Sequence, residues 1–500
     1  MEPELRLESS LWVGNKRYRA VLTGWHFNWT EVDKKNREKK TISVPVAEVV
    51  GVEEGRVDVL PQKSVEDTDK DFTVFYVKRC SSGSSYGLLW RLGRTQFSCP
   101  SRVLRDQWTK HLRTALKTHS PLRPHRLLVF INPFGGKKKG RQIYHSLVAP
   151  LFELAGISSH VIVTERANQA RDHLLKKDLT GFDGVVCVGG DGMFSEILHG
   201  LIGRTQQEAG LCENDPAVTL QPCPLHIGII PAGSTDCVCY ATVGVIDPVT
   251  SALHIIIGDS QPLDVGSVHQ ASALVHYSVS LLGYGFYGDV LAESEKHRWM
   301  GPLRYDYSGT KVYLSNRSYA GIVQYLPADP VLSSPRDRTR CLSGSCPKSP
   351  LGLSPSAHLA DGTGDLILVW DTHPLGFLKF LYRHTSTQDQ KRKVYEDIEA
   401  MSAALDEERV YVETVSRNGS QQQLAERGTG GEVTNEQKTA DLFLCGLCCS
   451  KAPAVSVWNC DGEILPFTEI LCRIHGQLVR LYARGIEDGA AVDSCSEEID

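Results

Sequence analysis

Apolar and polar positions follow three different patterns along the 500-residue chain. Short β-rich runs separated by Gly, Asp, Lys or Ser clusters predict strands over the first hundred residues. A stretch over 101–118 then places Val103, Trp108, Leu112 and Leu116 near helical spacing. The N-terminal segment is therefore predicted to be a strand-rich domain that ends in one amphipathic helix. The expected strands are 11–13, 18–22, 41–44, 49–52, 72–77 and 86–92.

A second pattern begins after the Pro-rich, basic linker 118–126. The run LLVFINP at 127–133 is typical of a parallel strand that is buried on both faces. Helical stretches at 142–156 and 167–179 then alternate with further apolar runs at 159–166 and 184–192. This alternation predicts an α/β sheet, in which ligands bind beyond the carboxyl ends of the strands.

Repeated short strands make up the third pattern, from about residue 263 onward. They are predicted at 276–285, 321–327, 365–370, 409–415, 454–463 and 477–486. The segment 328–357 is rich in Ser, Pro and Arg, and 415–450 begins with a stretch rich in Gln, Gly and Thr. Both are predicted to be disordered insertions.

Composition and charge narrow the class of protein. No run of about 18 apolar residues predicts a membrane span, and the acidic N-terminus does not read as a secretory signal. Fifteen dispersed cysteines indicate a reducing, cytosolic compartment rather than a disulfide scaffold. Residues 445–449 hold a single zinc-like cysteine pair, for which a loop or acylated cysteines are competing interpretations. Residues 1–124 hold 22 Lys and Arg against 15 Asp and Glu, which predicts an anionic partner, lipid or nucleic acid.

Two glycine-rich loops carry the candidate chemistry. Gly189, Gly190, Asp191 and Gly192 follow the strand at 184–189 and open a helix. Glycines there let backbone amides approach phosphate oxygens, and a helix N-terminus favours negative charge. The loop 231–236, PAGSTD, follows a second apolar strand. Two such loops on neighbouring strands are predicted to enclose a polyphosphate, with Asp191 placed to accept the proton of an acceptor hydroxyl, although a tight strand-to-helix turn also explains the first loop alone.

These motifs together resemble the diacylglycerol-kinase catalytic superfamily, which includes sphingosine, ceramide and bacterial lipid kinases. The set comprises NPxxG at 132–136, TER at 164–166, GGDG at 189–192, PAGST at 231–235 and GYGFYGDV at 283–290, followed by DGE at 461–463. The resemblance implies an α/β nucleotide-binding domain over 125–262 and an antiparallel, β-sandwich-like domain over 263–490. Nicotinamide-nucleotide kinases share GGDG-type loops, but the 283–309 segment favours a lipid kinase.

The resemblance also implies roles for individual residues. Asp191 corresponds to the residue that activates the lipid hydroxyl, and Asp289 and Leu291 to acceptor-binding positions. For Arg298 and Arg304, a surface ion pair with Glu293 or Asp306 is the alternative. The implied nucleotide contacts are Asn132, Pro133, Phe134, Gly135, Gly136, Thr164, Glu165, Arg166, Gly189, Gly190, Gly192, Ser234, Thr235, Glu295, Arg298, Arg304, Asp461 and Glu463.

The N-terminal segment, 1–120, resembles a pleckstrin-homology (PH) domain, with Trp108 in the closing helix. Such domains hold phosphoinositide headgroups with cations of the first strands and their loops. The candidates here are Lys16, Arg17, Arg19, Lys34 and Lys35. A charged, solvated face on a domain used only for packing is the alternative interpretation.

Within the superfamily the resemblance is closest to the ceramide kinases, through SEKHRWMGPLRYDYSG at 294–309 and WNCDGE at 458–463. Sphingosine kinases carry a second carboxylate at the position of Leu291, where it pairs with the ammonium of the substrate. Because an amide-linked lipid has no ammonium, Leu291 favours ceramide. Many relatives have Asn in place of Asp236, and the cysteine triplet of ceramide kinases is represented here only by Cys341 and Cys346.

The predicted function is ATP-dependent phosphorylation of the primary hydroxyl of ceramide, with Mg²⁺ as cofactor and a Ca²⁺ dependence left open. A sphingoid-base or diacylglycerol kinase, or a non-catalytic lipid-binding adaptor, is the alternative. We expect a cytoplasmic, peripheral membrane protein at the Golgi or plasma membrane, with no nucleic-acid partner. The stretch 375–393 combines apolar residues with cations and either binds calmodulin or a membrane surface, or forms a core helix.

Overall fold

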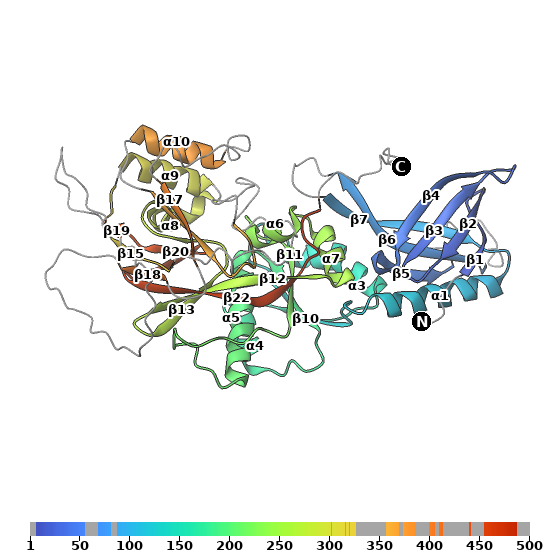
Figure 1. Ribbon diagram of the computed structural model, residues 1–500, viewed down its shortest axis with the longest axis horizontal. Coiled ribbons are helices and arrows are strands. Elements are labelled where there is room, and N and C mark those ends of the chain that lie inside the picture. Colours follow the sequence, from blue (N-terminus) through green and yellow to red (C-terminus); the bar gives the residue numbers. More distant parts are fainter. Residues whose placement is uncertain are drawn as a thin grey trace, which may run out of the picture.

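The fold comprises a sheet-and-helix module, an α/β domain and a β-rich C-terminal part (Figure 1). The predicted insertions 328–357 and 415–450, and the cysteines 341, 346 and 445–449, lie almost entirely outside the described residues. The computed structural model describes residues 7–55, 69–81, 88–301, 303–315, 317–319, 321–326, 357–369, 374–385, 400–405, 410–413, 440–441 and 455–487.

The N-terminal module is a seven-stranded antiparallel sheet with the strand order β4-β3-β2-β1-β7-β6-β5. Helix α1 closes it, and its Trp108 is fully buried among Phe27, Trp29, Phe72 and Phe97. This architecture confirms the PH-like fold. Its elements are β1 (Leu7–Val13), β2 (Lys16–Leu22), β3 (His26–Val32), β4 (Glu38–Pro45), η1 (Val46–Glu48), β5 (Val49–Glu54), β6 (Asp71–Ser81), β7 (Leu88–Ser98) and α1 (Arg102–His119).

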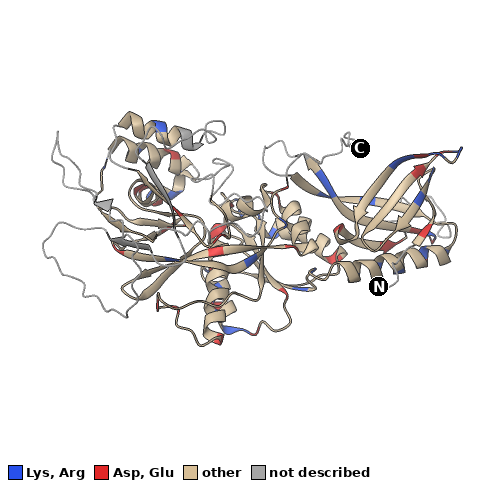
Figure 2. Ribbon diagram, in the orientation of Figure 1, with Lys and Arg blue, Asp and Glu red and all other residues tan. Residues whose placement is uncertain are grey.

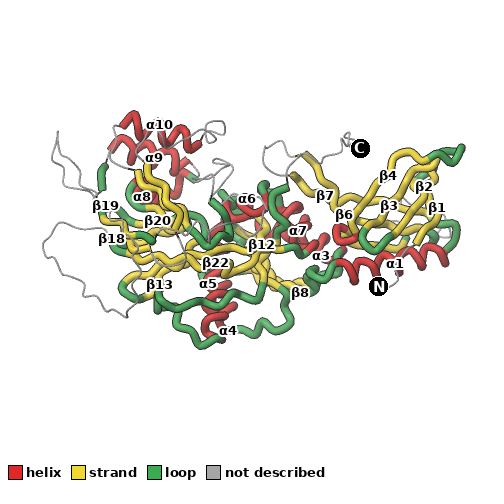
Figure 3. The backbone as a smooth tube through the Cα atoms, viewed as in Figure 1, coloured by secondary structure: helices red, strands yellow, loops and turns green. Residues whose placement is uncertain are grey.

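The α/β domain is built on four parallel strands in the order β9-β8-β10-β11. Every residue of β10 is buried, as expected for a strand covered on both faces. Figure 3 shows helices on either side of these strands. The elements are β8 (Arg126–Ile131), α2 (Gly140–Ile143), a π-helical turn η3 (Tyr144–Val148), α3 (Ala149–Leu154), β9 (Ser158–Val163), α4 (Gln169–Lys176), β10 (Gly184–Gly189), α5 (Asp191–Glu208), β11 (His226–Pro231), α6 (Cys237–Val243) and α7 (Pro248–Ile257).

Among its described residues, the C-terminal part contains antiparallel strands and the helices α8, α9 and α10, and these helices lie together at the end of the molecule away from the N-terminal module (Figure 1). Its helical elements are α8 (Phe286–Glu295), η4 (Arg298–Met300), α9 (Leu303–Ser315) and α10 (Pro374–Thr385). Its strands are β12 (Ser260–Gln270), β13 (Ala273–Ser278), β14 (Leu282–Gly283), β15 (Ile322–Gln324), β16 (Gly364–Val369), β17 (Ala400–Leu405), β18 (Val410–Glu413), β19 (Ala440–Asp441), β20 (Trp458–Cys460), β21 (Glu463–Leu465) and β22 (Ile470–Tyr482).

Strand β22 joins the two halves of the catalytic region, which the sequence predicts as separate domains. It pairs antiparallel with β12, in a register that runs from Ser260 opposite Tyr482 to His269 opposite Leu471. It also pairs parallel with β11, where Ile227 lies opposite Leu481. The result is one continuous ten-stranded sheet. Strand β22 therefore fixes how the β-rich part sits against the α/β domain.

The N-terminal module packs directly on the α/β domain. Val50, Phe75, Val77 and Trp90 of the module belong to the same hydrophobic cluster as α7. The Trp90 ring stacks on His254 of α7 with ring centroids 3.7 Å apart. Burial lowers the pKa of His254 to about 3, so a neutral imidazole faces the indole.

Partly buried ion pairs accompany this apolar contact. Glu48 bonds the guanidinium of Arg79 at 2.7 and 2.8 Å and that of Arg484 at 2.5 Å. Arg79 also binds Glu487 at 2.6 Å. These charged residues come from both ends of the chain, and their pairing ties the module to the segment that follows β22.

Within the described residues, no single helix is long and apolar enough to span a membrane. Helices α6 and α7 reach the required length and composition only together, and they are bent by 58° where they meet. All ten residues of α7 except Pro248 and Val249 are buried inside the protein, as in a core helix.

Candidate functional site

Three loops meet at the carboxyl ends of β8, β10 and β11, and glycines allow the contact. A Cβ atom on Gly233 would lie 2.5 Å from the Cα of Gly190, closer than real Cβ atoms approach. A Cβ on Gly136 would lie 2.6 Å from the carbonyl oxygen of Ala232, and Gly136 has a φ of +53°. The NPxxG, GGDG and PAGST loops predicted to bind nucleotide phosphates are therefore brought together. Gly192 has no neighbour within 4 Å of an added Cβ, so this face of the loop is open.

Asn132 shapes the first of these loops. Its side-chain Oδ1 accepts hydrogen bonds from the backbone amides of Phe134 (2.9 Å) and Gly135 (3.1 Å). The backbone amide of Asn132 donates a hydrogen bond to the carbonyl oxygen of Val188 in β10. Asn132 thus holds the loop against the neighbouring strand, while Phe134, Ser234 and Thr235 are exposed at the loop surfaces.

Asp191, the predicted base, is the first residue of α5 and is fixed by a second helix. Its two carboxylate oxygens accept hydrogen bonds from the amides of Cys237 (3.1 Å) and Val238 (3.2 Å), at the start of α6. These bonds aim the carboxylate at the junction of the GGDG and PAGST loops. The geometry suits a group that must receive a proton in one fixed position.

Asp236 is a second carboxylate at the same junction. It is 5% exposed, has a φ of +52° and accepts a hydrogen bond from the amide of Gly233 at 3.0 Å. Burial, together with the negative charge of Asp191, raises its pKa to about 7. The sequence drew attention to Asp236, but only the fold shows that it lies beside Asp191.

The TER residues at 164–166 form hydrogen bonds and an ion pair with other residues of the described chain. Thr164 is buried, and its amide and hydroxyl donate to the carbonyl oxygen of Ile131. Arg166 pairs with Asp172 on α4 at 2.6 Å. The amide of Glu165 donates to Gln169. Their predicted nucleotide contacts stay predictions, and their visible role is to anchor the turn after β9.

Glu463 belongs to a histidine cluster that the sequence did not predict. Its carboxylate lies 3.4 Å from Nε2 of His276, and this hydrogen bond lowers the pKa of Glu463. His276 is 4.5 Å from His199 of α5, centroid to centroid. His199 lies eight residues after Asp191, which corresponds to about 12 Å along a helix. The predicted nucleotide contact of Glu463 stays a prediction.

Asp461 stabilises a loop of the fold. Its carboxylate accepts hydrogen bonds from the amides of Val279, Ser280 and Leu281 and from the hydroxyl of Ser278. It thereby shapes the loop between β13 and β14. A nucleotide contact for Asp461 stays a prediction.

Glu295, Arg298 and Arg304 form one ion-pair group after α8. Glu295 binds Arg298 through one oxygen and Arg304 through the other, the latter at 3.2 Å. The expected alternative was an ion pair with Glu293 or Asp306, whereas the partner is Glu295. Glu293 instead binds Lys296, His297 and Lys311.

Three family models match successive parts of the chain. They describe the ceramide kinase PH domain (residues 7–112), the diacylglycerol kinase catalytic domain (126–268) and the ceramide kinase C-terminal domain (339–497). The human ceramide kinase is 42% identical, with 98% of each chain covered. The mouse ceramide kinase is 41% identical, over 96% of this chain and 98% of its own. The chain belongs to the ceramide kinase family.

Membership of this family confirms an ATP-dependent lipid kinase built from a PH-like module, an α/β catalytic domain and a β-rich part. Among solved structures, a putative diacylglycerol kinase from Bacillus anthracis str. Sterne is 14% identical, with a TM-score of 0.44, over 72% of this chain and 98% of its own.

In this ceramide kinase family member, both carboxylate oxygens of Asp289 accept hydrogen bonds within the protein. One oxygen accepts hydrogen bonds from Arg317 (2.9 Å) and Tyr319 (2.8 Å), and the other from the hydroxyl of Ser456 (2.6 Å). Leu291, two residues further along α8, is 5% exposed. Arg317 thus supplies a positive charge to Asp289 from within the protein.

Three of the five predicted phosphoinositide-binding cations are paired within the N-terminal module. Lys16 binds Glu31 (3.1 Å), Arg17 bonds Asn36, and Arg19 binds Glu8 and Glu38. Lys34 and Lys35 are exposed in the turn between β3 and β4. Figure 2 shows basic residues at this outer tip of the module.

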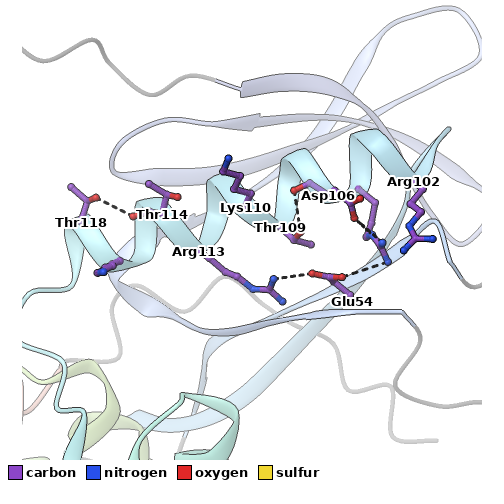
Figure 4. Close-up of a pocket in the computed structure, with 10 residues that line it drawn as sticks. Glu54, Arg102, Asp106, Thr109, Lys110, Arg113, Thr114 and Thr118 are labelled. Atoms are coloured by element: carbon purple, nitrogen blue, oxygen red, sulfur yellow. Dashed lines mark hydrogen bonds and ion pairs between the residues drawn. The ribbon is translucent and has the colours of Figure 1, made fainter.

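A separate cleft of about 620 Å³ runs along α1 (Figure 4). Arg113 reaches across it to Glu54 at 2.8 Å, and Arg105 lies within 4 Å of Glu54 and beside Asp106. Because these cations are paired and the cleft belongs to the N-terminal module, it contributes nothing to the phosphate loops.

Helix α10 covers the first part of the 375–393 stretch, and residues 386–393 lie outside the described residues. Phe380 is buried, and Phe377 packs on Phe286 of α8 with centroids 5.0 Å apart. One face of the helix is therefore part of the core, as the core-helix interpretation expects.

Proposed function

We propose that the chain transfers the γ-phosphate of ATP to the primary hydroxyl of ceramide, giving ceramide 1-phosphate, with Asp191 as the base. The observation that carries the proposal is the position of Asp191, held by two amides of α6 where two glycine loops touch. Sequence identity of 42% to the human ceramide kinase over nearly the full chain supports the choice of acceptor.

In the proposed reaction the lipid hydroxyl oxygen attacks the γ-phosphorus as Asp191 takes its proton. A new O–P bond forms, the bond between the γ-phosphorus and the bridging oxygen breaks, and ADP leaves with that electron pair. Amides of the glycine loops line the phosphate side, as expected for a reaction that depends on positioning and charge stabilisation. We place the adenosine end toward Glu463 and the histidine pair.

The acidic residues of this site fit a magnesium ion that arrives with the nucleotide. Mg²⁺ usually binds through one or two carboxylates plus substrate phosphates, and Asp191 and Asp236 supply two carboxylates at the loops. The described residues contain no group of three or more His, Cys, Asp or Glu that could hold a metal unaided. Mg²⁺ held by Asp191 and Asp236 together with the nucleotide would offset the charge of the phosphates. Replacing Mg²⁺ by Ca²⁺ in the assay below tests the calcium alternative.

The acceptor site favours a neutral lipid. A sphingoid base brings an ammonium group, but Asp289 already has a cationic partner in Arg317. Leu291 offers no second carboxylate and is buried. An amide-linked lipid such as ceramide leaves these groups undisturbed, because it needs hydrogen bonds rather than a counter-charge.

We also place the enzyme as a peripheral protein on the cytosolic face of the Golgi or plasma membrane. Lys34 and Lys35 are the exposed cations that suit a phosphoinositide headgroup, and their replacement by Glu should weaken binding to phosphoinositide vesicles. Calmodulin binding would require α10 to give up the packing of Phe377 and Phe380, so we favour the membrane interpretation of this region.

A radiolabelled-ATP assay in mixed micelles tests the proposed function. The purified full chain is given ceramide, sphingosine and diacylglycerol separately, with Mg²⁺, and lipid products are separated and counted. We expect label in ceramide 1-phosphate at a rate at least tenfold above the other two lipids. Faster labelling of sphingosine or diacylglycerol would reassign the acceptor, and no labelling of any lipid would leave the adaptor alternative.

A further inference from the structure

Helix α9 exposes a stripe of large apolar side chains. Leu303 is 66% exposed, Tyr307 45% and Leu314 74%. At about 100° per residue these three positions fall within roughly 40° of one another, so they share one face of the helix. The opposite side carries Ser308, which is fully buried.

Helix α10 shows a second stripe of the same kind. Leu375 (67% exposed), Leu378 (46%) and Tyr382 (68%) follow the spacing i, i+3, i+7 and lie on one face. The inward face holds Phe377 and Phe380. Helix α10 thus carries large apolar side chains on its inner and outer sides, and the exposed Lys379 lies about 40° from Leu375 beside the outer stripe.

The two stripes belong to one surface. The hydroxyl of Tyr313 on α9 donates to the carbonyl oxygen of Pro374 at 3.0 Å, and its ring stacks on Phe377. Figure 1 shows α9 and α10 side by side at the end of the molecule opposite the N-terminal module. Trp299, in the turn η4 just before α9, is 82% exposed. We call Trp299 and the six stripe residues the α9–α10 apolar face.

A lipid bilayer matches the chemistry of this face. Exposed apolar patches of this kind mark interaction sites, and Trp and Tyr beside Leu are enriched where proteins meet the interface of a membrane. Lys296 (68% exposed) and Lys311 (55%) lie beside the face, with a charge that suits anionic lipids. Glu293 partly balances these lysines, so apolar burial supplies most of the expected attraction.

The position of the face in the chain favours the same partner. Helix α9 follows η4 and α8, and α8 carries Asp289 and Leu291 of the proposed acceptor site. The acceptor of the proposed reaction is itself a membrane lipid. A surface that rests in the bilayer next to α8 would bring the acceptor site to the leaflet that contains its substrate.

We propose that the α9–α10 apolar face docks on the membrane and inserts its Trp, Tyr and Leu side chains into the headgroup and upper acyl region. This contact lies at the other end of the molecule from the PH-like module and deepens the proposed function, on which it rests. It gives the enzyme two points of attachment, and two attachments hold a surface more strongly than either alone.

The test uses neutral phosphatidylcholine vesicles without phosphoinositides, so that the N-terminal module contributes little. The full chain carrying L303S and L378S is compared with wild type by vesicle flotation. The matched control is V103S, because Val103 is also exposed (68%) but lies on α1. We expect the double variant to bind at least tenfold more weakly, and V103S to bind as wild type does.

Two further measurements separate folding from docking. The double variant should keep the wild-type melting temperature and the wild-type rate on a short-chain, water-soluble ceramide. Trp299 serves as a reporter: vesicles should shift the fluorescence of wild type to the blue, and W299F should lose a large part of that shift. Unchanged vesicle binding by the double variant, with unchanged melting, overturns the proposal.

Three further outcomes of these experiments also test the docking proposal. If the variants instead abolish a dimer seen by sedimentation and leave vesicle binding intact, the face meets a second copy of the chain and the proposal fails. Equal vesicle binding with a lower melting temperature means that the chain covers the face itself, and again the proposal fails. If wild type docks through this face but phosphorylates no lipid, the proposed function fails while the docking stands.

Discussion

Two carboxylates of this protein are equally buried and have opposite surroundings. Glu48, at the junction between the N-terminal module and the α/β domain, and Asp236, at the phosphate loops, are each 5% exposed. Burial disfavours the charge of Glu48, but the hydrogen bonds and charges of Arg79 and Arg484 outweigh it and lower its pKa. Burial and the charge of Asp191 together raise the pKa of Asp236 to about 7.

The difference separates a junction built for stability from a site built for a ligand. At the module junction, each acid meets an arginine, so the fold alone satisfies its charges. At the phosphate loops, two acids stand together, and among the described residues no cation is positioned to offset Asp236. A site with an excess of negative charge is ready for a cation that accompanies phosphates. Charge replacements at the two places should therefore have different consequences.

The largest effect is expected for Asp191→Asn, which removes the proposed base and keeps the shape of the side chain. The rate of lipid phosphorylation should fall by about 10²–10⁴-fold, the usual contribution of a general base. Binding of ATP in the absence of Mg²⁺, measured by calorimetry, should change by less than about threefold, because the glycine loops remain. Near-normal turnover of the purified variant would remove Asp191 from the mechanism.

The next largest effect is expected for Glu48→Gln at the junction. Arg79 and Arg484 would lose their shared buried acid, and breaking a buried pair in this way typically costs about 3–5 kcal/mol. Calorimetric melting should show a lower melting temperature, with the first unfolding step assigned to separation of the module. A melting temperature within one degree of wild type would show that the remaining acids, Asp259 and Glu487, satisfy both arginines.

Asp236→Asn should raise the stability of the protein, whereas Glu48→Gln should lower it. The folded-state pKa of Asp236 lies above its ordinary value of 3.8, so the wild type has its full stability from this group below about pH 4 and loses it as the pH rises through 7. Without nucleotide, the variant should be more stable than wild type by up to about 4 kcal/mol at pH 8 and nearly equal at pH 4. Melting curves at the two pH values check the sign, and a variant that is less stable at pH 8 would contradict it.

The smallest effect is expected for Arg113→Ala, which breaks the exposed ion pair with Glu54 in the α1 cleft. Exposed pairs of this kind contribute at most about 1 kcal/mol, so the melting temperature should barely move and lipid phosphorylation should be unchanged. Arg113→Ala is therefore the matched control for Glu48→Gln. A large loss of stability here would mean that the cleft holds the module together.

The phosphate loops could be predicted from the sequence because their chemistry is local. The glycines, Asn132 and Asp191 each follow a buried strand within a few residues, so their meeting at one edge of the sheet follows from the parallel arrangement. The division into a strand-rich module closed by a helix, an α/β domain and a β-rich part was likewise predictable from changes of periodicity, whereas the PH-like character of the module came from the resemblance. The proposed nucleotide and acceptor contacts stay predictions, because none of the observations tests them.

The features that could not be predicted depend on contacts between residues that are far apart in the sequence. Glu48 and Arg484 are separated by 436 positions, and nothing near either residue indicates the other. The His199–His276–Glu463 cluster likewise joins three separate elements, and the closeness of Asp236 to Asp191 arises only when the loops after β10 and β11 pack. For the 375–393 stretch the sequence leaves a core helix and a surface-binding helix open, and only the fold shows that Leu378 is exposed while Phe380 is buried.

Strand β22 also has a consequence for how the protein is made. The edge of β11 is completed by residues from the last tenth of the chain. During synthesis, the α/β domain must therefore wait, with the edge of β11 uncovered, until residues 470–482 have left the ribosome. Shortened products that end before Ile470 would leave that edge open to other chains, so premature termination should give aggregates rather than a smaller working kinase.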